Sequence, residues 1–240
     1  MTEEVPLEGG FLTDVVRVGD TVRRTATDRT PWIHDLLRFL RAAGFDAAPE
    51  PIGIDERGRE VLTFVDGETR RGSEPDDGVL VDVMGLARRL HDLTAGSAFA
   101  EGGECVVHRD LSPRNTVFRG GRPIALLDWD GAGPGRRVED VSRACWQFVE
   151  HGAGVDPKHV GRRWRLMADA YGLDEGRSTL VVEIAARMDE SADRYERLAA
   201  AGVPAFERLV ELGAPATVRS VRDWVFEHRA ALEAAVGLTA

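Results

Sequence analysis

The chain has 240 residues, of which 43% are hydrophobic and 30% charged, and its formal net charge is −10. This length suits one large domain or a small lobe with a larger one, and the acidic balance argues against a nucleic-acid partner while permitting a cationic ligand. No apolar run reaches the roughly eighteen residues of a membrane span, and the acidic N-terminus lacks a secretory signal pattern. We therefore expect a cytoplasmic protein with no membrane partner.

The first part of the chain is expected to form short strands around one helix. β-branched residues flank the turn signal Gly19-Asp20, and apolar residues recur at helical spacing from Trp32 until Gly44. The expected elements are strands at 15–18, 21–24, 51–55 and 60–65 and a helix at 32–43.

Beyond a polar linker rich in glycine and proline at residues 66–78, the pattern becomes mainly helical. Residues 105–130 interrupt it, because two short strand-like runs on either side of Gly120-Gly121 predict a hairpin. The picture is an α+β protein with a small, mostly β lobe and a larger α lobe that contains one hairpin. The expected helices are 79–93, 138–151, 157–171, 177–201, 204–212 and 216–236.

The residues that indicate chemistry gather around this hairpin. Asp110 is followed five residues later by Asn115, and Asp128 ends the second strand-like run. Phosphoryl transfer to a hydroxyl needs a group that orients the hydroxyl and takes its proton, which suits Asp110. Magnesium prefers carboxylate and amide oxygens, which Asp128 and Asn115 provide. The ordinary alternative is that such loop side chains only cap turns.

Two motifs in this stretch carry a family resemblance. His108-x-Asp110-x4-Asn115 resembles the catalytic loop of the aminoglycoside phosphotransferase and choline kinase family, relatives of the protein kinases, and Leu127-Asp128-Trp129-Asp130 resembles its second metal motif. The resemblance is sharp over residues 105–141. We expect His108 to be a scaffold residue that hydrogen-bonds the loop backbone.

The resemblance implies a two-lobed, protein-kinase-like α+β fold. Its N-terminal nucleotide-binding lobe would comprise residues 1–66, and residues 67–240 would form a helical lobe with the catalytic loop and substrate site. It also implies an ATP- and Mg²⁺-dependent kinase of small-molecule alcohols. Asp110 would be its catalytic residue, and Asn115 and Asp128 its metal ligands.

The phosphate-binding cation departs from the family pattern. The family has a lysine on its third strand, but the only lysine of this chain is Lys158. Strand alternation puts Arg24 on one face and Arg23 on the other, so Arg24 is our candidate and Arg23 the runner-up. The helix at 32–43 lacks the family's glutamate, so that His34 or Asp35 replaces it or the ion pair is absent.

Two further features belong to the expected nucleotide site. Gly9 and Gly10 would present backbone amides to the phosphates, although two glycines also suit an ordinary turn. Phe64 and Val65 are expected at the hinge whose backbone meets adenine.

The acceptor is expected to be the hydroxyl of a small molecule, such as an aminoglycoside or another antibiotic. Residues 129–139 are too few for a regulatory activation loop, and no Ala-Pro-Glu segment follows, which argues against a protein kinase. Asp189 and Asp193 lie one helical turn apart and suit an amine, but we favour an ordinary solvated face paired with Arg187, Arg194 and Arg197. The alternative function is a pseudokinase that binds nucleotide or small molecule without phosphoryl transfer. The sequence gives no oligomeric state.

Overall fold

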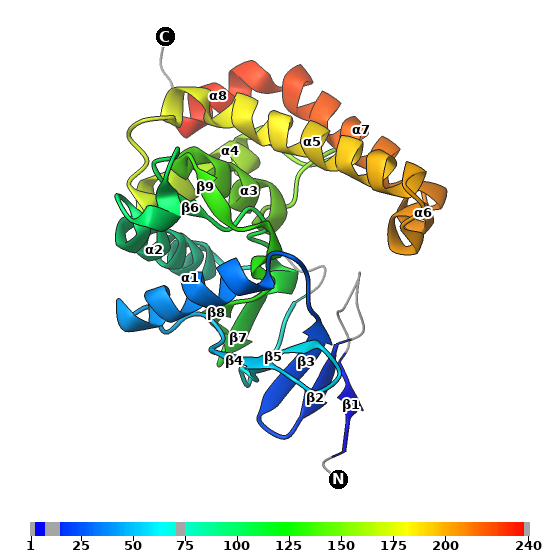
Figure 1. The fold of residues 1–240 in the computed structure, drawn as a ribbon. Coiled ribbons are helices and arrows are strands. Elements are labelled where there is room, and N and C mark those ends of the chain that lie inside the picture. Colours follow the sequence, from blue (N-terminus) through cyan, green and yellow to red (C-terminus); the bar gives the residue numbers. More distant parts are fainter. Residues whose placement is uncertain (1–2, 8–14, 71–74, 238–240) are drawn as a thin grey trace. The chain divides into compact units, whose positions relative to one another are not determined.

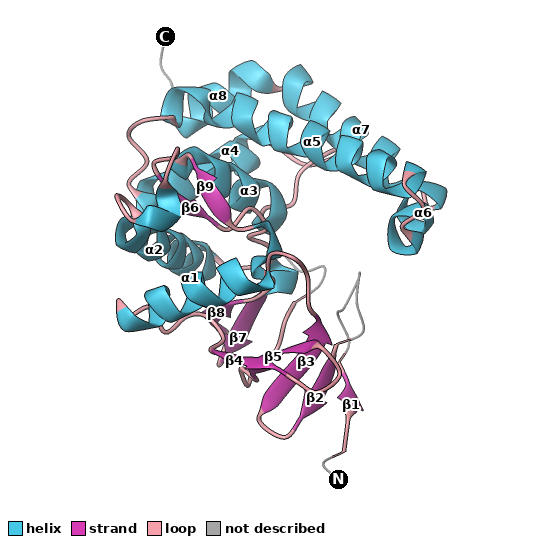
Figure 2. Cartoon of the chain, in the orientation of Figure 1, coloured by secondary structure: helices cyan, strands magenta, loops and turns pink. Residues whose placement is uncertain are grey.

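The computed structural model describes residues 3–7, 15–70 and 75–237, which form two compact units (Figure 1). The first unit comprises Met1–Ser73 and Arg88–Arg136, and the second comprises Glu74–Ala87 and Arg137–Ala240. Within the described ranges every strand belongs to the first unit, and the second is helical (Figure 2). The predicted lobe boundary after residue 66 stays a prediction, because the two compact units are not the same as the two predicted lobes.

A five-stranded antiparallel sheet organises the first part of the chain. It consists of β1 (Val5–Pro6), β2 (Val16–Val18), β3 (Thr21–Thr25), β4 (Pro51–Ile54) and β5 (Arg59–Thr63), in the order β1-β2-β3-β5-β4. The register places Arg24 directly opposite Glu60. The strands predicted at 15–18, 21–24, 51–55 and 60–65 are present, but the last one ends two residues earlier than predicted, at Thr63, so that Phe64 and Val65 follow the strand.

Helix α1 (Thr30–Ala42) buries one face in the same unit. Ile33, Leu36, Leu37 and Leu40 recur at helical spacing and are almost completely buried. The helix ends just before Gly44, which has a positive φ of 85°. The predicted helix is confirmed, and its inward face also carries the buried His34.

Two short sheets hold the loops that follow. The predicted hairpin is present as β7 (Thr116–Arg119) and β8 (Arg122–Leu126), and its turn residues Gly120 and Gly121 have φ of 57° and 81°. Such a two-residue turn needs positive φ at both positions, which glycine adopts without strain. Strands β6 (Cys105–Val107) and β9 (Gly133–Gly135) pair antiparallel, which the sequence pattern did not predict. The pair β6–β9 brackets the predicted catalytic and metal motifs.

The second unit is helical, and α2 contributes only its first turns to it. The helices are α2 (Asp77–Thr94), α3 (Arg137–Phe148), α4 (Pro157–Tyr171), α5 (Leu180–Ala200), α6 (Pro204–Glu211), α7 (Ala214–Glu227) and α8 (Arg229–Val236). Helix α5 packs against α7 and α6, and α4 packs against α8 (Figure 1). The helix predicted at 216–236 is wrong in one respect, because it is divided into α7 and α8 at His228, whose φ of −101° and ψ of 12° are not helical. No helix among the described residues is long and apolar enough to cross a membrane. Short 3-10 turns lie at η1 (Ala98–Ala100), η2 (Pro113–Asn115), η3 (Trp129–Gly131) and η4 (Arg177–Thr179).

Candidate active site

The loop after β6 is held by a buried histidine. The Nδ1 atom of His108 accepts a hydrogen bond from the backbone amide of Asp110 at 3.3 Å, and its ring lies edge-on to Trp129 with 4.7 Å between centroids. Arg109, between them, has a positive φ of 66°, a costly conformation for a residue with a side chain. His108 therefore has the predicted scaffold role, and the turn that it stabilises presents Asp110.

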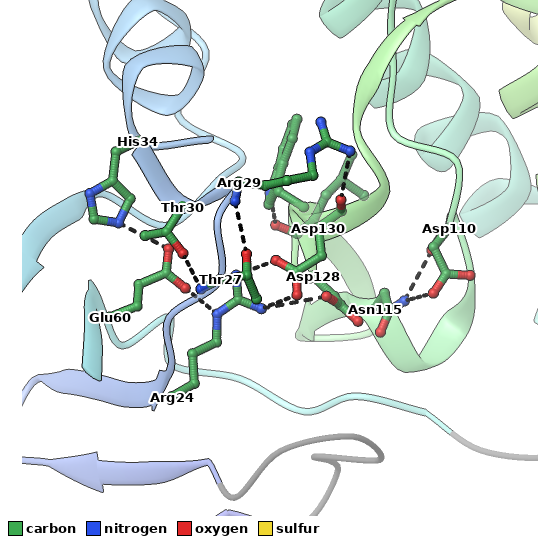
Figure 3. Close-up of polar contacts among 12 residues, drawn as sticks. Arg24, Thr27, Arg29, Thr30, His34, Glu60, Asp110, Asn115, Asp128 and Asp130 are labelled. Carbon is green, nitrogen blue, oxygen red and sulfur yellow. Dashed lines mark hydrogen bonds and ion pairs between the residues drawn. The ribbon is translucent and has the colours of Figure 1, made fainter. Parts of the chain in front are cut away.

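Asp110 and Asn115 are in direct contact (Figure 3). The Asn115 amide nitrogen donates to Asp110 Oδ2 at 2.7 Å and to the Asp110 carbonyl at 3.1 Å. Because the amide nitrogen is used in this way, the oxygen of the same side chain is the end that remains to accept or to bind a cation. The loop thus orients a carboxylate and an amide oxygen together.

Asp128 is tied to this loop through the backbone. The amide of Leu127 donates to the Asn115 carbonyl at 2.7 Å, and Asp128 itself adopts a left-handed conformation with φ 61° and ψ 68°. A non-glycine residue in this region is strained, and such strain concentrates at functional sites. The two predicted metal ligands are therefore held in neighbouring backbone segments.

The electrostatics at Asp128 suit a cation. The side chain of Asp128 is half exposed, but partial burial of the carboxyl still raises its pKa, the carboxylates of Asp130 and Asp110 raise it further, and Arg24 opposes the rise. Nearby carboxylates repel one another, and a divalent ion would relieve that repulsion. Asn115 and Asp128 fit Mg²⁺, a hard cation that keeps several waters and phosphate oxygens. No group of three or more His, Cys, Asp or Glu suited to a metal ion occurs among the described residues.

The structure places Arg24 next to the metal motif. Its guanidinium forms ion pairs with Glu60, with Asp130 at 2.6 Å and with Asp128 at 3.5 Å. Although burial lowers the pKa of Arg24, the carboxylates of Asp130 and Glu60 raise it above its usual value. Arg23 lies on the other face of β3, where it is 3.7 Å from Asp55. Of the two arginines, Arg24 is the one beside the predicted metal ligand Asp128.

Glu60 is the site residue that sequence reasoning missed. It is fully buried, lies opposite Arg24 in the sheet and has its Oε1 atom 2.9 Å from His34 Nε2. Of the two expected substitutes, His34 contacts Glu60 rather than Arg24, and Asp35 is exposed and pairs with Arg38. The sequence did contain a signal for Glu60, which is a glutamate within the strand directly before the apolar Val61-Leu62. A carboxylate that is buried in a strand needs a partner of opposite charge, so this position indicates an ion pair.

The remaining nucleotide-site predictions are untested. Gly9 and Gly10 lie outside the described residues. The Phe64 amide donates to the Asp20 carbonyl at 2.8 Å, so a base would have to meet the Phe64 carbonyl or the backbone of Val65. The hinge assignment of Phe64 and Val65 therefore stays a prediction.

Two more arginines hold the segment after Asp128. Arg29, just before α1, donates to the carbonyls of Asp130 at 3.1 Å and of Ala132. Arg109 donates to the Pro134 carbonyl at 2.6 Å. The segment between the metal motif and β9 is thus fixed through its own backbone.

In the second unit, the acidic face of α5 is already neutralised. Arg222 pairs with Asp189 at 2.6 Å, and Arg219 pairs with Asp193 at 2.8 Å and Glu196 at 2.6 Å. The favoured interpretation of an ordinary ion-paired face therefore agrees with the structure better than an amine site. The arginines come from α7 rather than mainly from α5 itself.

Comparison with known proteins identifies the family. The chain matches the model of the phosphotransferase enzyme family over residues 97–174, which include Asp110, Asn115 and Asp128. It is also 32% identical over 262 aligned residues to a trifolitoxin immunity protein of Rhizobium leguminosarum bv. trifolii, with 98% of this chain and 100% of the relative covered. The chain belongs to the phosphotransferase enzyme family.

The fold of the chain is similar to several solved structures. A choline/ethanolamine kinase family protein from Mesorhizobium loti superposes with a TM-score of 0.64 at 16% identity, covering 100% of this chain and 93% of that one. A spectinomycin phosphotransferase in complex with ADP and spectinomycin gives 0.64 at 10% identity, with coverage of 94% and 92%. A gentamicin-bound phosphotransferase gives 0.56 at 12% identity, with coverage of 96% and 90%. The predicted kinase-like α+β fold is confirmed.

Proposed function

We propose that this phosphotransferase transfers the terminal phosphoryl group of ATP, with Mg²⁺, to a hydroxyl of a small molecule. The observation that carries the proposal is the contact between Asp110 and Asn115, whose amide nitrogen lies 2.7 Å from the Asp110 carboxylate. The backbone bond from Leu127 to Asn115 adds Asp128 to the same constellation. This set combines a base with two oxygen ligands for a hard cation.

In the proposed mechanism, Asp110 orients the acceptor hydroxyl and takes its proton as the phosphoryl group moves. Asn115 and Asp128 would hold Mg²⁺, which supplies neutralisation of the phosphate charge. A positioned base of this kind contributes about 10²- to 10⁴-fold to the rate. Arg24 would bind phosphate oxygens, and its fork of donors suits them.

The rest of the nucleotide site follows the sequence predictions. Gly9 and Gly10 would present amides to phosphate, and Phe64 and Val65 would meet adenine. Relatives of the same fold were solved with ADP or ATP, which supports nucleotide use. An ATP-dependent reaction also favours the cytoplasm as the location of the protein.

The acceptor class that we propose is an antimicrobial small molecule. The full-length relative is named an immunity protein against trifolitoxin, and structural neighbours act on or bind gentamicin, spectinomycin and macrolides. Phosphorylating a hydroxyl of such a compound would protect the cell from it. The acidic net charge of −10 is compatible with a cationic acceptor.

The test is ADP release from Mg-ATP against a panel of aminoglycosides, spectinomycin, macrolides, peptide antibiotics, nucleoside antibiotics, choline and small sugars. We expect release that depends on one acceptor class and falls about 10²- to 10⁴-fold in Asp110→Ala. Asp46→Ala is the matched control, because Asp46 is an exposed aspartate of the same unit that pairs with Arg89. Full activity in Asp110→Ala would contradict the proposed role of that carboxylate.

A second candidate, a pseudokinase that binds without transfer, is favoured by one observation. Arg24 pairs with both Asp128 and Asp130, so the predicted metal ligand Asp128 and its neighbour Asp130 already have a counter-charge. Mg-dependent binding of ATP without phosphoryl transfer to any member of the panel would support this candidate over the enzyme.

A further inference from the structure

Arg24 lies between two sets of carboxylates that differ in burial. On one side is Glu60, whose side chain is completely buried. On the other side are Asp128 and Asp130, whose side chains are 49% and 45% exposed. Arg24 itself is only 14% exposed. The guanidinium therefore has one partner shielded from solvent and two partners that a dissolved ligand can reach.

Glu60 is held from two directions, one of them the helix α1 (Figure 3). Its Oε2 atom contacts Nε of Arg24, and its Oε1 atom lies 2.9 Å from Nε2 of His34. A carboxylate with no access to water stays ionised only when its oxygens are paired. With both oxygens paired, Glu60 fixes the direction in which the Arg24 guanidinium points.

The two exposed partners are held unequally. Asp130 meets Arg24 at 2.6 Å and 3.2 Å, and its carbonyl accepts from Arg29. Asp128 contacts Arg24 only at 3.5 Å, beyond the usual length of a charged hydrogen bond. Asp128 is thus the partner that an incoming anion replaces most easily.

We propose that Glu60 and His34 are positioning residues that orient Arg24 toward the phosphates of a bound nucleoside di- or triphosphate. This inference rests on the proposed function and adds two residues to it, one from β5 and one from α1. Glu60 stays paired with Arg24 whether or not a nucleotide is bound. When the nucleotide binds, its phosphate oxygens replace Asp128 as the partner of the exposed edge of the guanidinium. A purely structural ion pair between β3, β5 and α1 would have no such preference for phosphate.

The experiment compares the binding of two ligands, Mg-ADP and adenosine, by isothermal titration calorimetry. Glu60→Gln keeps the size of the side chain and removes its charge. Glu50→Gln is the matched control, because Glu50 also pairs with α1, through Arg41, but its side chain is 46% exposed. We expect Glu60→Gln to weaken Mg-ADP about tenfold or more, since hydrogen bonds to charged groups are the strong ones. Adenosine should bind both variants and the wild type equally.

His34→Gln provides a milder variant, because glutamine retains a donor for Glu60. We expect about a threefold loss of Mg-ADP affinity, with the KM for ATP raised by the same factor and the KM for the acceptor unchanged. Should Glu60→Gln fail to fold, Glu60→Asp, which keeps the charge but shortens its reach, and His34→Gln decide the matter in the same assay.

The outcomes separate this inference from the proposed function. Wild-type affinity for Mg-ADP in Glu60→Gln and His34→Gln would overturn the positioning role and leave the phosphotransferase proposal intact. Equal losses for Mg-ADP and adenosine would also overturn it, because they would show a general effect on the unit. A wild-type protein that binds neither nucleotide nor adenosine would overturn the proposed function itself.

Discussion

Each unit contains a cluster in which arginine meets several carboxylates, and the two clusters differ in their surroundings. In the first unit, Arg24 pairs with Glu60, Asp128 and Asp130, and one of these partners is fully buried. In the second unit, Arg219 pairs with Asp193 and Glu196, whose side chains are 63% and 49% exposed.

The difference shows that burial decides how strongly an ion pair constrains its side chains and how much it contributes to stability. Exposed pairs contribute little, because water and salt already stabilise the separated charges. A buried carboxylate depends on its partners, and removing one leaves a charge without compensation. The Arg24 cluster is therefore the one whose geometry is strongly constrained, as a binding site requires.

The two clusters should differ most in the loss of stability that follows removal of the arginine from each of them. Arg24→Ala leaves Glu60 buried with His34 as its remaining partner, and we expect the free energy of unfolding to fall by about 3–5 kcal/mol. Arg219→Ala should leave it almost unchanged, because its partners are solvated. Urea denaturation of both variants measures this, and an equal loss in the two would remove burial as the explanation.

His151 tests the importance of burial within the second unit. It packs between Trp164 and Trp224, its Nδ1 bonds the Val149 carbonyl, and its Nε2 is buried with no hydrogen-bond partner in the part of the chain that the structure describes. Burial lowers the pKa of His151 below its usual 6.5, which the bond to the carbonyl partly offsets. An acidic solution therefore protonates this side chain in the unfolded chain before it does so in the folded one.

The sign of the pH effect follows from that order. Above about pH 6.5 both states are neutral at this site, and as the pH falls below that value the unfolded state binds the extra proton, so stability decreases. One proton changes the free energy of unfolding by at most about 1.4 kcal/mol per pH unit. His151→Phe should flatten the profile measured between pH 5 and 7, whereas an unchanged slope would assign the effect to other groups.

We expect the smallest effect from added salt, which compares the screening of the ion pairs in the two clusters. At about 1 M salt the Debye length is near 3 Å, so exposed pairs are screened while buried ones are affected much less. Double-mutant cycles for Arg24 with Glu60 and for Arg219 with Glu196 measure the two coupling energies. We expect only the second to fall between 0.1 and 1 M NaCl, and a similar fall in both would mean that water reaches Glu60.

Local sequence determined the elements and the central motif of the site. Periodicity placed α1, α2 and α4 and the hairpin β7–β8, because these features depend on residues close together in the chain. That Asp110, Asn115 and Asp128 lie close together was predictable from their spacing and from the resemblance of their motifs, since one loop and one hairpin hold them. The preference for Arg24 over Arg23 beside the motif followed from the alternation of a single strand.

Contacts between distant segments needed the tertiary structure. Glu60 is 36 residues from Arg24 and 26 from His34, and only the register of β3 against β5 and the packing of α1 bring the three together. The pairing of α7 arginines with the acidic face of α5 arises in the same way from helix packing. The left-handed backbone of Asp128 could not be predicted either, because an aspartate adopts that conformation only occasionally, although more often than most residues with a side chain. Residue types thus specified which chemistry was present, and packing decided which charges became partners.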